Sequence, residues 1–319
     1  MTFRIQALLF CVVVIGSIAV SRLLMPRAAP EVPASGLNAR AAETSASPSA
    51  AYKEAAMTGS VGGEAANPER RWDVLDPVIA AQAVTVQSID SHFSFLNYHT
   101  YALWPMASLT KLLTATVALE NLGLDAKVSV SEHAVQTEGA SGGLVAGEKY
   151  ATRDLVKLML LSSSNDAAAA FEEYAFASDT FVGLMTKKIA EIGMTQTVVN
   201  DASGLSDYNV SSASDLLKLA RYIAERHPEI FEWTRLQTFI AQPLGAATSN
   251  NIANINPFSA DRDFLGGKTG TSPAAGENLL ALFRAGDRRI AVVVLGAKDR
   301  VALTNSLRNW IEKAYTFNR

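Results

Sequence analysis

Three short polar signatures occur along this chain in a fixed order, and they constrain it more than any other feature. They are Ser108-Leu109-Thr110-Lys111, Ser163-Ser164-Asn165 and Lys268-Thr269-Gly270. Each combines a hydroxyl with an amine or an amide, and none contains a histidine. A serine hydroxyl is a weak nucleophile at neutral pH and needs a neighbouring base, which a lysine with a lowered pKa can supply. Together the signatures indicate a nucleophilic serine without a histidine base.

The first signature lies at the beginning of a predicted helix. Apolar residues recur at helical spacing over residues 108–122, namely Leu109, Leu112, Leu113, Val117, Leu119 and Leu122. Residues i and i+3 share a helix face, so Ser108 and Lys111 are expected to meet. Pro105 suits the approach to a helix and would place Ser108 in the first turn, where free backbone N–H groups can face an oxyanion. Taken alone, this spacing fits an exposed helix face equally well, because about one such pair arises by chance in a chain of this length.

The second signature lies between two predicted helices. Thr152 is expected to cap the first helix, which covers residues 153–161. Asp166 is expected to open the second helix, over residues 167–174. The serine and asparagine of the signature would then lie on a tight link between two largely buried helices. Polar side chains in such a place are costly unless they have partners, which favours a functional role.

The third signature is predicted to lie on a strand. We expect a strand from Phe264 to Thr271, a turn over residues 272–276 and a second strand over residues 278–283. Glycines beside Lys268 and Thr269 would let a substrate backbone approach the strand edge, where a peptide can add as an extra strand. The lysine and threonine side chains could then bind a terminal carboxylate. An ordinary hairpin with a surface lysine is the alternative for this motif alone, but three matches in order make it remote.

Longer stretches around the signatures resemble the serine-type D-alanyl-D-alanine carboxypeptidases, which belong to the low-molecular-mass penicillin-binding proteins. The matching stretches are residues 107–115, 160–168, 200–205 (Asn-Asp-Ala-Ser-Gly-Leu) and 267–270, the last followed by Ala275-Gly276. The resemblance implies an α+β fold of the β-lactamase/transpeptidase-like class, with an antiparallel sheet flanked by helices plus a helical subdomain. The active site would lie between the sheet and that subdomain.

The apolar pattern predicts further elements of this domain. We expect strands over residues 83–90 and 99–103 near its beginning. Near its end we expect a buried strand over residues 289–295 and an amphipathic helix over residues 301–317.

The resemblance also implies a role for each residue of the first two signatures. Ser108 would attack the penultimate peptide carbonyl of a peptidoglycan stem peptide that ends in D-Ala-D-Ala, and Lys111 would take its proton. Ser163 would help to relay that proton to the leaving group. Asn165 would position the substrate amide. The predicted catalytic residues are therefore Ser108, Lys111, Ser163 and Asn165, and water would hydrolyse the acyl-enzyme.

The third signature would bind the substrate. By the same resemblance, Lys268 and Thr269 would hold the substrate carboxylate, and the backbone N–H groups of Ser108 and Thr271 would form the oxyanion hole. Lys268, Thr269, Gly270 and Thr271 are thus the predicted substrate-binding residues. β-Lactam antibiotics, which mimic the scissile peptide, are the expected inhibitors.

Composition excludes several other function classes. The chain is 49% hydrophobic and carries a formal net charge of −3, so it is an ordinary globular protein without the basic excess of a nucleic-acid binder. Its only cysteine, Cys11, lies in an apolar N-terminal segment, which leaves no disulfide, cysteine zinc site or thiol nucleophile for the rest. The four histidines lack metal-ligand spacing. We therefore predict no cofactor, no metal and no nucleic-acid partner.

The N-terminal quarter of the chain differs in composition from the rest. Residues 1–26 contain a largely apolar run and predict either a cleaved signal peptide or a retained membrane anchor. Residues 27–71 are rich in Ala, Ser and Pro without any period and predict a disordered linker. Residues 72–319 form the predicted catalytic domain. The protein is therefore expected to be exported to the cell envelope, at the outer face of the cytoplasmic membrane, either anchored or periplasmic or extracellular.

Four activities fit these observations to different degrees. A D,D-carboxypeptidase that hydrolyses the D-Ala-D-Ala bond through an acyl-enzyme is favoured, and a D,D-endopeptidase that cleaves peptidoglycan cross-links is the close alternative. A β-lactamase would need a positioned glutamate for rapid deacylation, whereas the chain offers residues 200–205 after the second signature. A catalytically idle penicillin-binding regulator would not need intact catalytic signatures. An acylation assay separates the idle regulator from the D,D-carboxypeptidase.

Overall fold

The computed structural model describes residues 67–139, 142–174 and 179–317. The predicted signal segment and nearly all of the predicted linker lie outside these residues. Within the described ranges no helix is both long enough and apolar enough to cross a bilayer.

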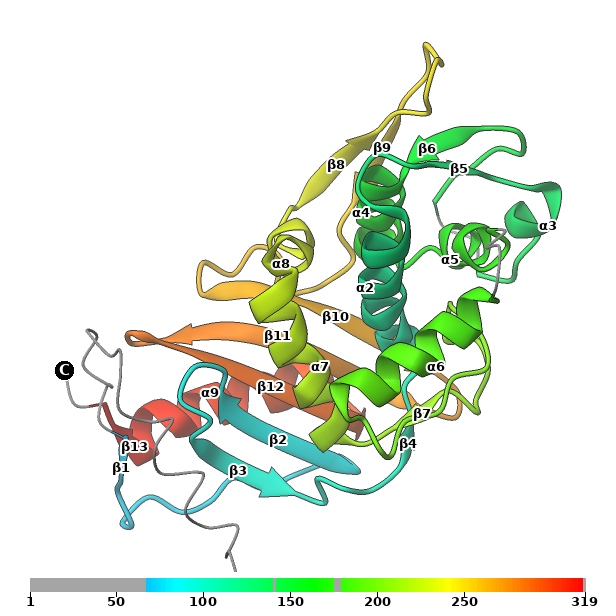
Figure 1. The fold of residues 1–319 in the computed structure, drawn as a ribbon. Helices are drawn as coiled ribbons and strands as arrows, with labels where there is room; N and C mark the ends of the chain where they lie inside the picture. The colour runs from blue at the N-terminus through cyan, green and yellow to red at the C-terminus, as the bar shows by residue number, and fades with distance from the viewer. Residues whose placement is uncertain (1–66, 140–141, 175–178, 318–319) are drawn as a thin grey trace, which may run out of the picture. The chain divides into compact units, whose positions relative to one another are not determined.

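The centre of the fold is a five-stranded antiparallel sheet (Figure 1). Its order is β10 (Phe264–Ser272), β11 (Gly276–Ala285), β12 (Arg288–Ala297), β2 (Ala83–Ser88) and β3 (Ser94–Tyr98). This sheet and the helices around it confirm the predicted α+β class. β10 is an edge strand, as a site for an added peptide strand requires.

One predicted strand is wrong. We expected a strand over residues 99–103, but the strand in this part of the chain is β3, which covers Ser94–Tyr98 and ends before His99. His99 has a positive φ of 46°, and its carbonyl accepts a hydrogen bond from the Ala102 backbone N–H at 2.9 Å. A residue in this left-handed region turns the chain, so the apolar and aromatic residues that follow His99 cannot continue the ladder.

Helices and short strand pairs surround the sheet. The helices are α2 (Thr110–Leu122), α3 (Glu132–Val135), α4 (Thr152–Ser162), α5 (Asn165–Glu172), α6 (Phe181–Ile192), α7 (Ala213–Arg226), α8 (Pro228–Thr234) and α9 (Arg300–Ala314). The 3₁₀ turn η1 (Ala107–Leu109) leads directly into α2. The strand pairs are β1 (Glu69–Arg70) with β13 (Tyr315–Thr316), β4 (Trp104–Pro105) with β7 (Val210–Ser211), β5 (Lys127–Ser129) with β6 (Lys149–Ala151), and β8 (Thr238–Ala241) with β9 (Asn250–Ala253).

Both faces of the sheet are buried, which explains the long apolar runs of β11 and β12. Successive residues of a strand point to opposite faces. Leu280 and Leu282 of β11 join the core on the side of the helical subdomain, whereas Leu279 and Phe283 join a second core with α9. The sheet is therefore the middle layer of the fold. Helix α9 covers one face, and the helical subdomain, which includes α2 and α7, covers the other.

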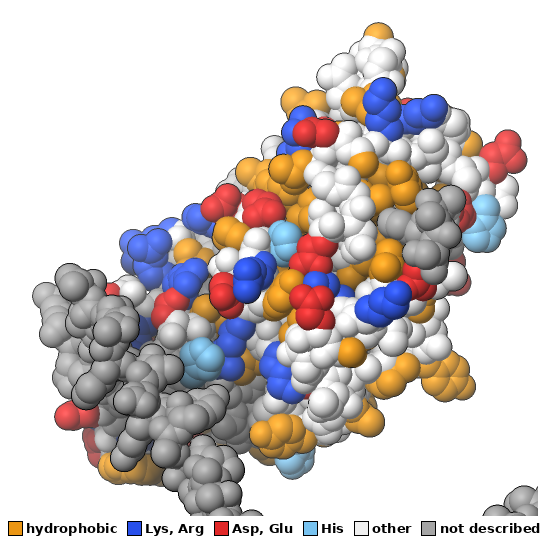
Figure 2. All heavy atoms as spheres, in the orientation of Figure 1, with side chains coloured by type: hydrophobic (Ala, Val, Ile, Leu, Met, Phe, Trp, Pro, Cys, Tyr) orange, Lys and Arg blue, Asp and Glu red, His pale blue; other side chains and the backbone are white. Residues whose placement is uncertain are grey.

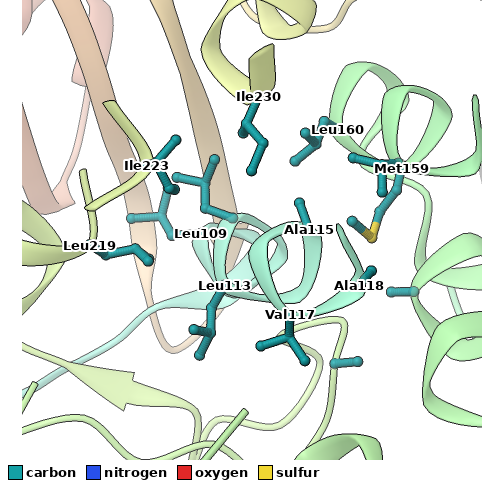
Figure 3. Close-up of a cluster of buried hydrophobic side chains, with 14 of the residues drawn as sticks. Leu109, Leu113, Ala115, Val117, Ala118, Met159, Leu160, Leu219, Ile223 and Ile230 are labelled. Atoms are coloured by element: carbon teal, nitrogen blue, oxygen red, sulfur yellow. The ribbon is translucent and has the colours of Figure 1, made fainter. Parts of the chain in front are cut away.

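Helix α2 is the centre of the helical subdomain. Figure 3 shows apolar side chains from several elements converging on it, among them Met159 of α4, Ile223 of α7 and Ile230 of α8. Its residues Leu112, Leu113 and Val117 are fully buried or nearly so. Because packing surrounds this helix, the side chains at its beginning are held in fixed positions relative to the sheet.

The last helix is shorter than predicted. The helix expected over residues 301–317 ends at Ala314, and Tyr315–Thr316 form β13 against β1. The two residues of β1, Glu69–Arg70, fall within the predicted linker, so the ordered part of the chain extends before residue 72. The Arg70 guanidinium lies over the rings of Trp310 and Tyr315, 5.2 and 5.4 Å from their centroids.

The described surface carries charges of both signs. Figure 2 shows acidic and basic side chains interspersed over the face in view. Basic side chains do not gather into a stripe on this face of the described residues.

Candidate active site

The first signature lies where the helical subdomain meets the edge strand of the sheet. Ser108 is in η1, immediately before α2, and the start of α2 lies beside β10 (Figure 1). The approach is very close, since a Cβ on Gly270 would lie 2.8 Å from the Met106 carbonyl oxygen and 3.2 Å from the Ser108 backbone nitrogen. Only glycine allows the strand to pass the serine at this distance.

Lys111 lies one helical turn after Ser108 and is completely buried. Its Nζ donates hydrogen bonds to Ser108 Oγ at 3.1 Å, to Asn165 Oδ1 at 2.6 Å and to the Ser203 carbonyl at 2.6 Å. Burial lowers the pKa of Lys111 to about 7, although the negative charges of Asp201 and Asp166 oppose this shift. A large fraction of this amine is therefore neutral near neutral pH.

The second signature reverses the chain between α4 and α5, as predicted. Ser163 has a left-handed φ of 60° and ends α4. Ser164 then caps α5, because its hydroxyl accepts the Ala167 backbone N–H at 3.0 Å. The turn directs Asn165 toward Lys111 and brings Ser163 Oγ within 3.0 Å of Lys268 Nζ.

Two predicted helix boundaries near this signature are wrong. Thr152 is the first residue of α4 and does not cap it; its hydroxyl donates to the Ala126 carbonyl at 3.2 Å instead. The second helix begins at Asn165 and ends at Glu172. Ser164 occupies the capping position two residues before Asp166, and the Ala167 N–H of the first turn is shared by the Ser164 hydroxyl and Asp166 Oδ1, both at 3.0 Å.

The third signature lies on β10, as predicted. Lys268 is buried, and its Nζ donates to Ser163 Oγ at 3.0 Å and to the Thr269 carbonyl at 2.8 Å. Burial lowers the pKa of Lys268 well below its ordinary value, and the positive charges of Lys111 and Arg300 lower it further. Thr269 is also buried, whereas Thr271 at the far end of the strand is exposed.

The structure therefore joins the three signatures into one site. Lys111 links Ser108 to Asn165, and Lys268 links the strand to Ser163. The described residues contain no group of three or more His, Cys, Asp or Glu side chains placed to hold a metal ion. The chemistry that the site offers is that of hydroxyl, amine and amide groups.

The loop after α6 contributes to the site in a way that its residue types do not reveal. The Ser203 carbonyl accepts from Lys111, and the loop is held in shape by Asp201. The Asp201 carboxylate accepts backbone N–H groups from Ser203, Gly204 and Ser206 at 2.6–2.8 Å. Burial opposes ionisation of Asp201, but these hydrogen bonds outweigh it and lower the pKa. The loop thus holds a fixed negative charge near Lys111.

Two further residues from outside the signatures fix the strand beside the serine. Arg300 of α9 donates from Nη1 to the carbonyls of Gly270 at 2.7 Å and Asn278 at 3.0 Å. Asn278 of β11 donates from Nδ2 to the carbonyls of Pro105 at 2.8 Å and Met106 at 3.1 Å. These bonds tie β10, β11 and the turn before Ser108 together.

Comparison with known proteins agrees with this geometry. The sequence profile of D-alanyl-D-alanine carboxypeptidases matches residues 76–299. A D-alanyl-D-alanine endopeptidase of Haemophilus influenzae is 30% identical over 73% of this chain and 81% of its own length. A D-alanyl-D-alanine carboxypeptidase of Escherichia coli is 31% identical over 63% of this chain and 52% of its own length.

Solved structures show the same fold. A D-alanyl-D-alanine carboxypeptidase of Mycobacterium tuberculosis superposes with a TM-score of 0.69 at 25% identity, covering 79% of this chain and 99% of that chain. A Streptomyces DD-transpeptidase superposes with a TM-score of 0.69 at 25% identity, covering 74% of this chain and 98% of its own. The fold is thus of the β-lactamase/transpeptidase-like class, and the chain belongs to the D-alanyl-D-alanine carboxypeptidase family of serine peptidases.

Proposed function

We propose that the chain hydrolyses D-Ala-D-Ala-terminated stem peptides of peptidoglycan through an acyl-enzyme on Ser108. The observation that carries this proposal is the set of hydrogen bonds around Lys111 Nζ. Two of its three acceptors, Asn165 Oδ1 and the Ser203 carbonyl, can only accept. A neutral amine has two hydrogens and one lone pair, so these two acceptors take the hydrogens and the lone pair faces the Ser108 hydroxyl. Lys111 is then the base that removes the proton from Ser108.

The remaining groups have roles in substrate binding and proton transfer. Asn165 has one amide N–H on the Glu138 carbonyl at 2.8 Å, which leaves the other N–H for a substrate carbonyl. Ser163 lies next to Lys268 and would pass a proton to the leaving group. The backbone N–H groups of Ser108 and Thr271 would stabilise the oxyanion, as the close passage of β10 past η1 permits.

The open edge of β10 is the proposed peptide-binding site. A stem peptide would add there as an extra strand, with its carboxylate held by Lys268 and Thr269 and its backbone close to Gly270. The incoming carboxylate would raise the pKa of the buried Lys268 and draw a proton onto it. We also propose that the protein is exported and acts at the outer face of the cytoplasmic membrane, because its substrate is found there and residues 1–26 have the composition of an export segment.

The first test is covalent labelling. A fluorescent penicillin should acylate wild-type protein, and peptide mass mapping should find the adduct on Ser108. Ser108→Ala should abolish labelling while the circular dichroism spectrum stays that of the wild type. An adduct on a different residue, or none on the folded wild type, would refute the assignment and favour an idle regulator.

A D,D-endopeptidase is the second candidate, and the relatives supply the observation that favours it. The chain is 30% and 28% identical to endopeptidases of H. influenzae and E. coli and spans 81% and 78% of their lengths, and it spans 74% of a carboxypeptidase of M. tuberculosis, so both activities occur among relatives of similar length. Incubation with defined muropeptides separates the two activities. Release of the terminal D-alanine from a monomeric pentapeptide supports the carboxypeptidase that we favour. Faster cleavage of a cross-linked dimer than of any monomer would establish the endopeptidase instead.

A further inference from the structure

The peptide unit of Ala202 is held by two helices of the active site. Its N–H donates to Glu172 Oε2 at 2.8 Å, at the last residue of α5. Its carbonyl accepts from Thr114 Oγ1 at 2.6 Å, one turn after Lys111 on α2. The very next carbonyl, that of Ser203, accepts from Lys111. Ala202 is therefore fixed from both sides directly before the carbonyl that orients the proposed base.

We propose that Glu172 is a positioning residue for Lys111. Glu172 acts through the Ala202 and Ser203 peptide units, whose position it fixes. The Ser203 carbonyl then accepts one hydrogen of Lys111, and the lone pair of Lys111 stays directed at Ser108. This inference rests on the proposed acyl-enzyme mechanism and adds a residue that lies outside the three signatures.

The surroundings of Glu172 disfavour the charged form of its carboxyl group. The charged and titratable groups that face it are Asp201 on the loop, Glu173 on its own helix and His133 on α3. Burial raises the pKa of Glu172, and the charges of Asp201 and Glu173 raise it further. The hydrogen bond from Ala202 and, to a smaller extent, His133 favour the charged form of Glu172. Glu172 is therefore a partly buried carboxylate close to that of Asp201, and its hydrogen bond to the loop offsets part of the cost of its charge.

Removal of this carboxylate should weaken the base and shift its titration. In Glu172→Ala the Ala202 N–H loses its acceptor while the Thr114 bond to the Ala202 carbonyl remains, so the Ser203 carbonyl and the Asp201 charge are held less firmly near Lys111. Both changes disfavour the ammonium form and lower the pKa of Lys111. The plateau rate of β-lactam acylation should fall about tenfold to a hundredfold because the base is misplaced. The midpoint of the pH profile should move to lower pH, which simple loss of folded protein would not cause.

Two further variants sharpen the test. Glu172→Gln keeps an oxygen that accepts the Ala202 N–H, so it should restore most of the plateau rate. Glu173→Ala is the matched control, because its carboxylate contacts Ser131 and His133 and not the loop. It should keep both the rate and the midpoint of the wild type.

The experiment measures acylation by a chromogenic β-lactam against pH, with the Ser108 adduct verified by mass mapping for every variant. A lowered plateau and a midpoint at lower pH in Glu172→Ala, with rescue by Gln, support the inference. A wild-type plateau, or a lowered plateau with an unmoved midpoint, overturns it while leaving the Ser108 mechanism intact. If the alanine variant does not fold, Glu172→Met takes its place, because it keeps the bulk of the side chain but offers no oxygen to the Ala202 N–H. A lowered plateau with a downward midpoint shift in that variant supports the inference, and a wild-type profile overturns it. Absence of a Ser108 adduct in the wild type would instead refute the proposed function itself.

Discussion

Two buried lysines at opposite ends of α2 have opposite electrostatic surroundings. Lys111, at the beginning of the helix, has only neutral oxygens as hydrogen-bond partners among the described residues, those of Ser108, Asn165 and Ser203, and its pKa is lowered to about 7. Lys188 of α6 packs against the other end, where it forms ion pairs with Glu120 and Glu191.

The pKa of Lys188 shifts upward for a clear reason. Burial alone would lower it, but hydrogen bonds to Glu120, Glu191 and Tyr222 together raise it. A buried ammonium with carboxylate partners stays charged and serves structure, whereas a buried amine among neutral acceptors can lose its proton and serve chemistry. The two lysines therefore differ in their partners, and Lys111 is also the more deeply buried of the two.

The largest expected effect is at Lys111. Lys111→Arg keeps the positive charge and similar bulk, but a guanidinium does not give up a proton near neutral pH. The rate of acylation by a β-lactam should fall about 10²- to 10⁴-fold, the usual contribution of a general base. Stopped-flow acylation of the variant, with a thermal melt to verify folding, measures this. A variant that acylates at the wild-type rate would identify some other group as the base.

A smaller effect is expected for the substrate carboxylate at Lys268. Within the part of the chain that the structure describes, this lysine, like Lys111, has only neutral oxygens as hydrogen-bond partners, so a substrate carboxylate would be its ionic partner. A stem peptide with a C-terminal amide lacks that partner. Such a contact contributes about 1.5–3 kcal/mol, so kcat/KM should fall about tenfold to a hundredfold relative to the free acid. The measurement compares kcat/KM for matched peptides with a free acid and with an amide. Equal values would show that Lys268 does not bind the substrate carboxylate.

The smallest effect on activity is expected at Lys188. Lys188→Met removes the cation from between Glu120 and Glu191 but leaves the active site untouched. The free energy of unfolding should fall by about 1 kcal/mol, because Glu120 and the exposed Glu191 lose an ion pair while Glu120 keeps its bonds to Tyr222 and His227. Acylation by folded protein should not change. Denaturant unfolding and acylation of the same sample test both statements, and a slowed acylation would show that the two lysines are coupled.

The sequence alone predicts the parts of the site that lie on regular elements. Helical spacing brings Ser108 and Lys111 together, and the strand pattern around Lys268 places that lysine on the edge of a hairpin. The chain reversal at Ser163 also follows from the two apolar segments on either side of it. Local periodicity determines these positions, so they can be read without knowledge of the fold.

The rest depends on tertiary contacts that no local pattern encodes. The Ser203 acceptor is a backbone carbonyl, and every residue has one, so only the fold reveals which of them reaches Lys111. Thr152 has the residue type of a cap, but its hydroxyl bonds to Ala126 on a neighbouring segment. The strand expected after residue 98 fails because His99 adopts a left-handed conformation.

The pH dependence of acylation tests the central claim most directly, that Lys111 is a neutral base at neutral pH. A base acts only when it is deprotonated, so the rate should rise as the pH increases through the pKa of Lys111. For the wild type we expect a rise of about tenfold per pH unit below a midpoint near 7, followed by a plateau. Lys111→Arg should lack this midpoint. A wild-type rate that is independent of pH over this range, or a midpoint that persists in Lys111→Arg, would contradict the account.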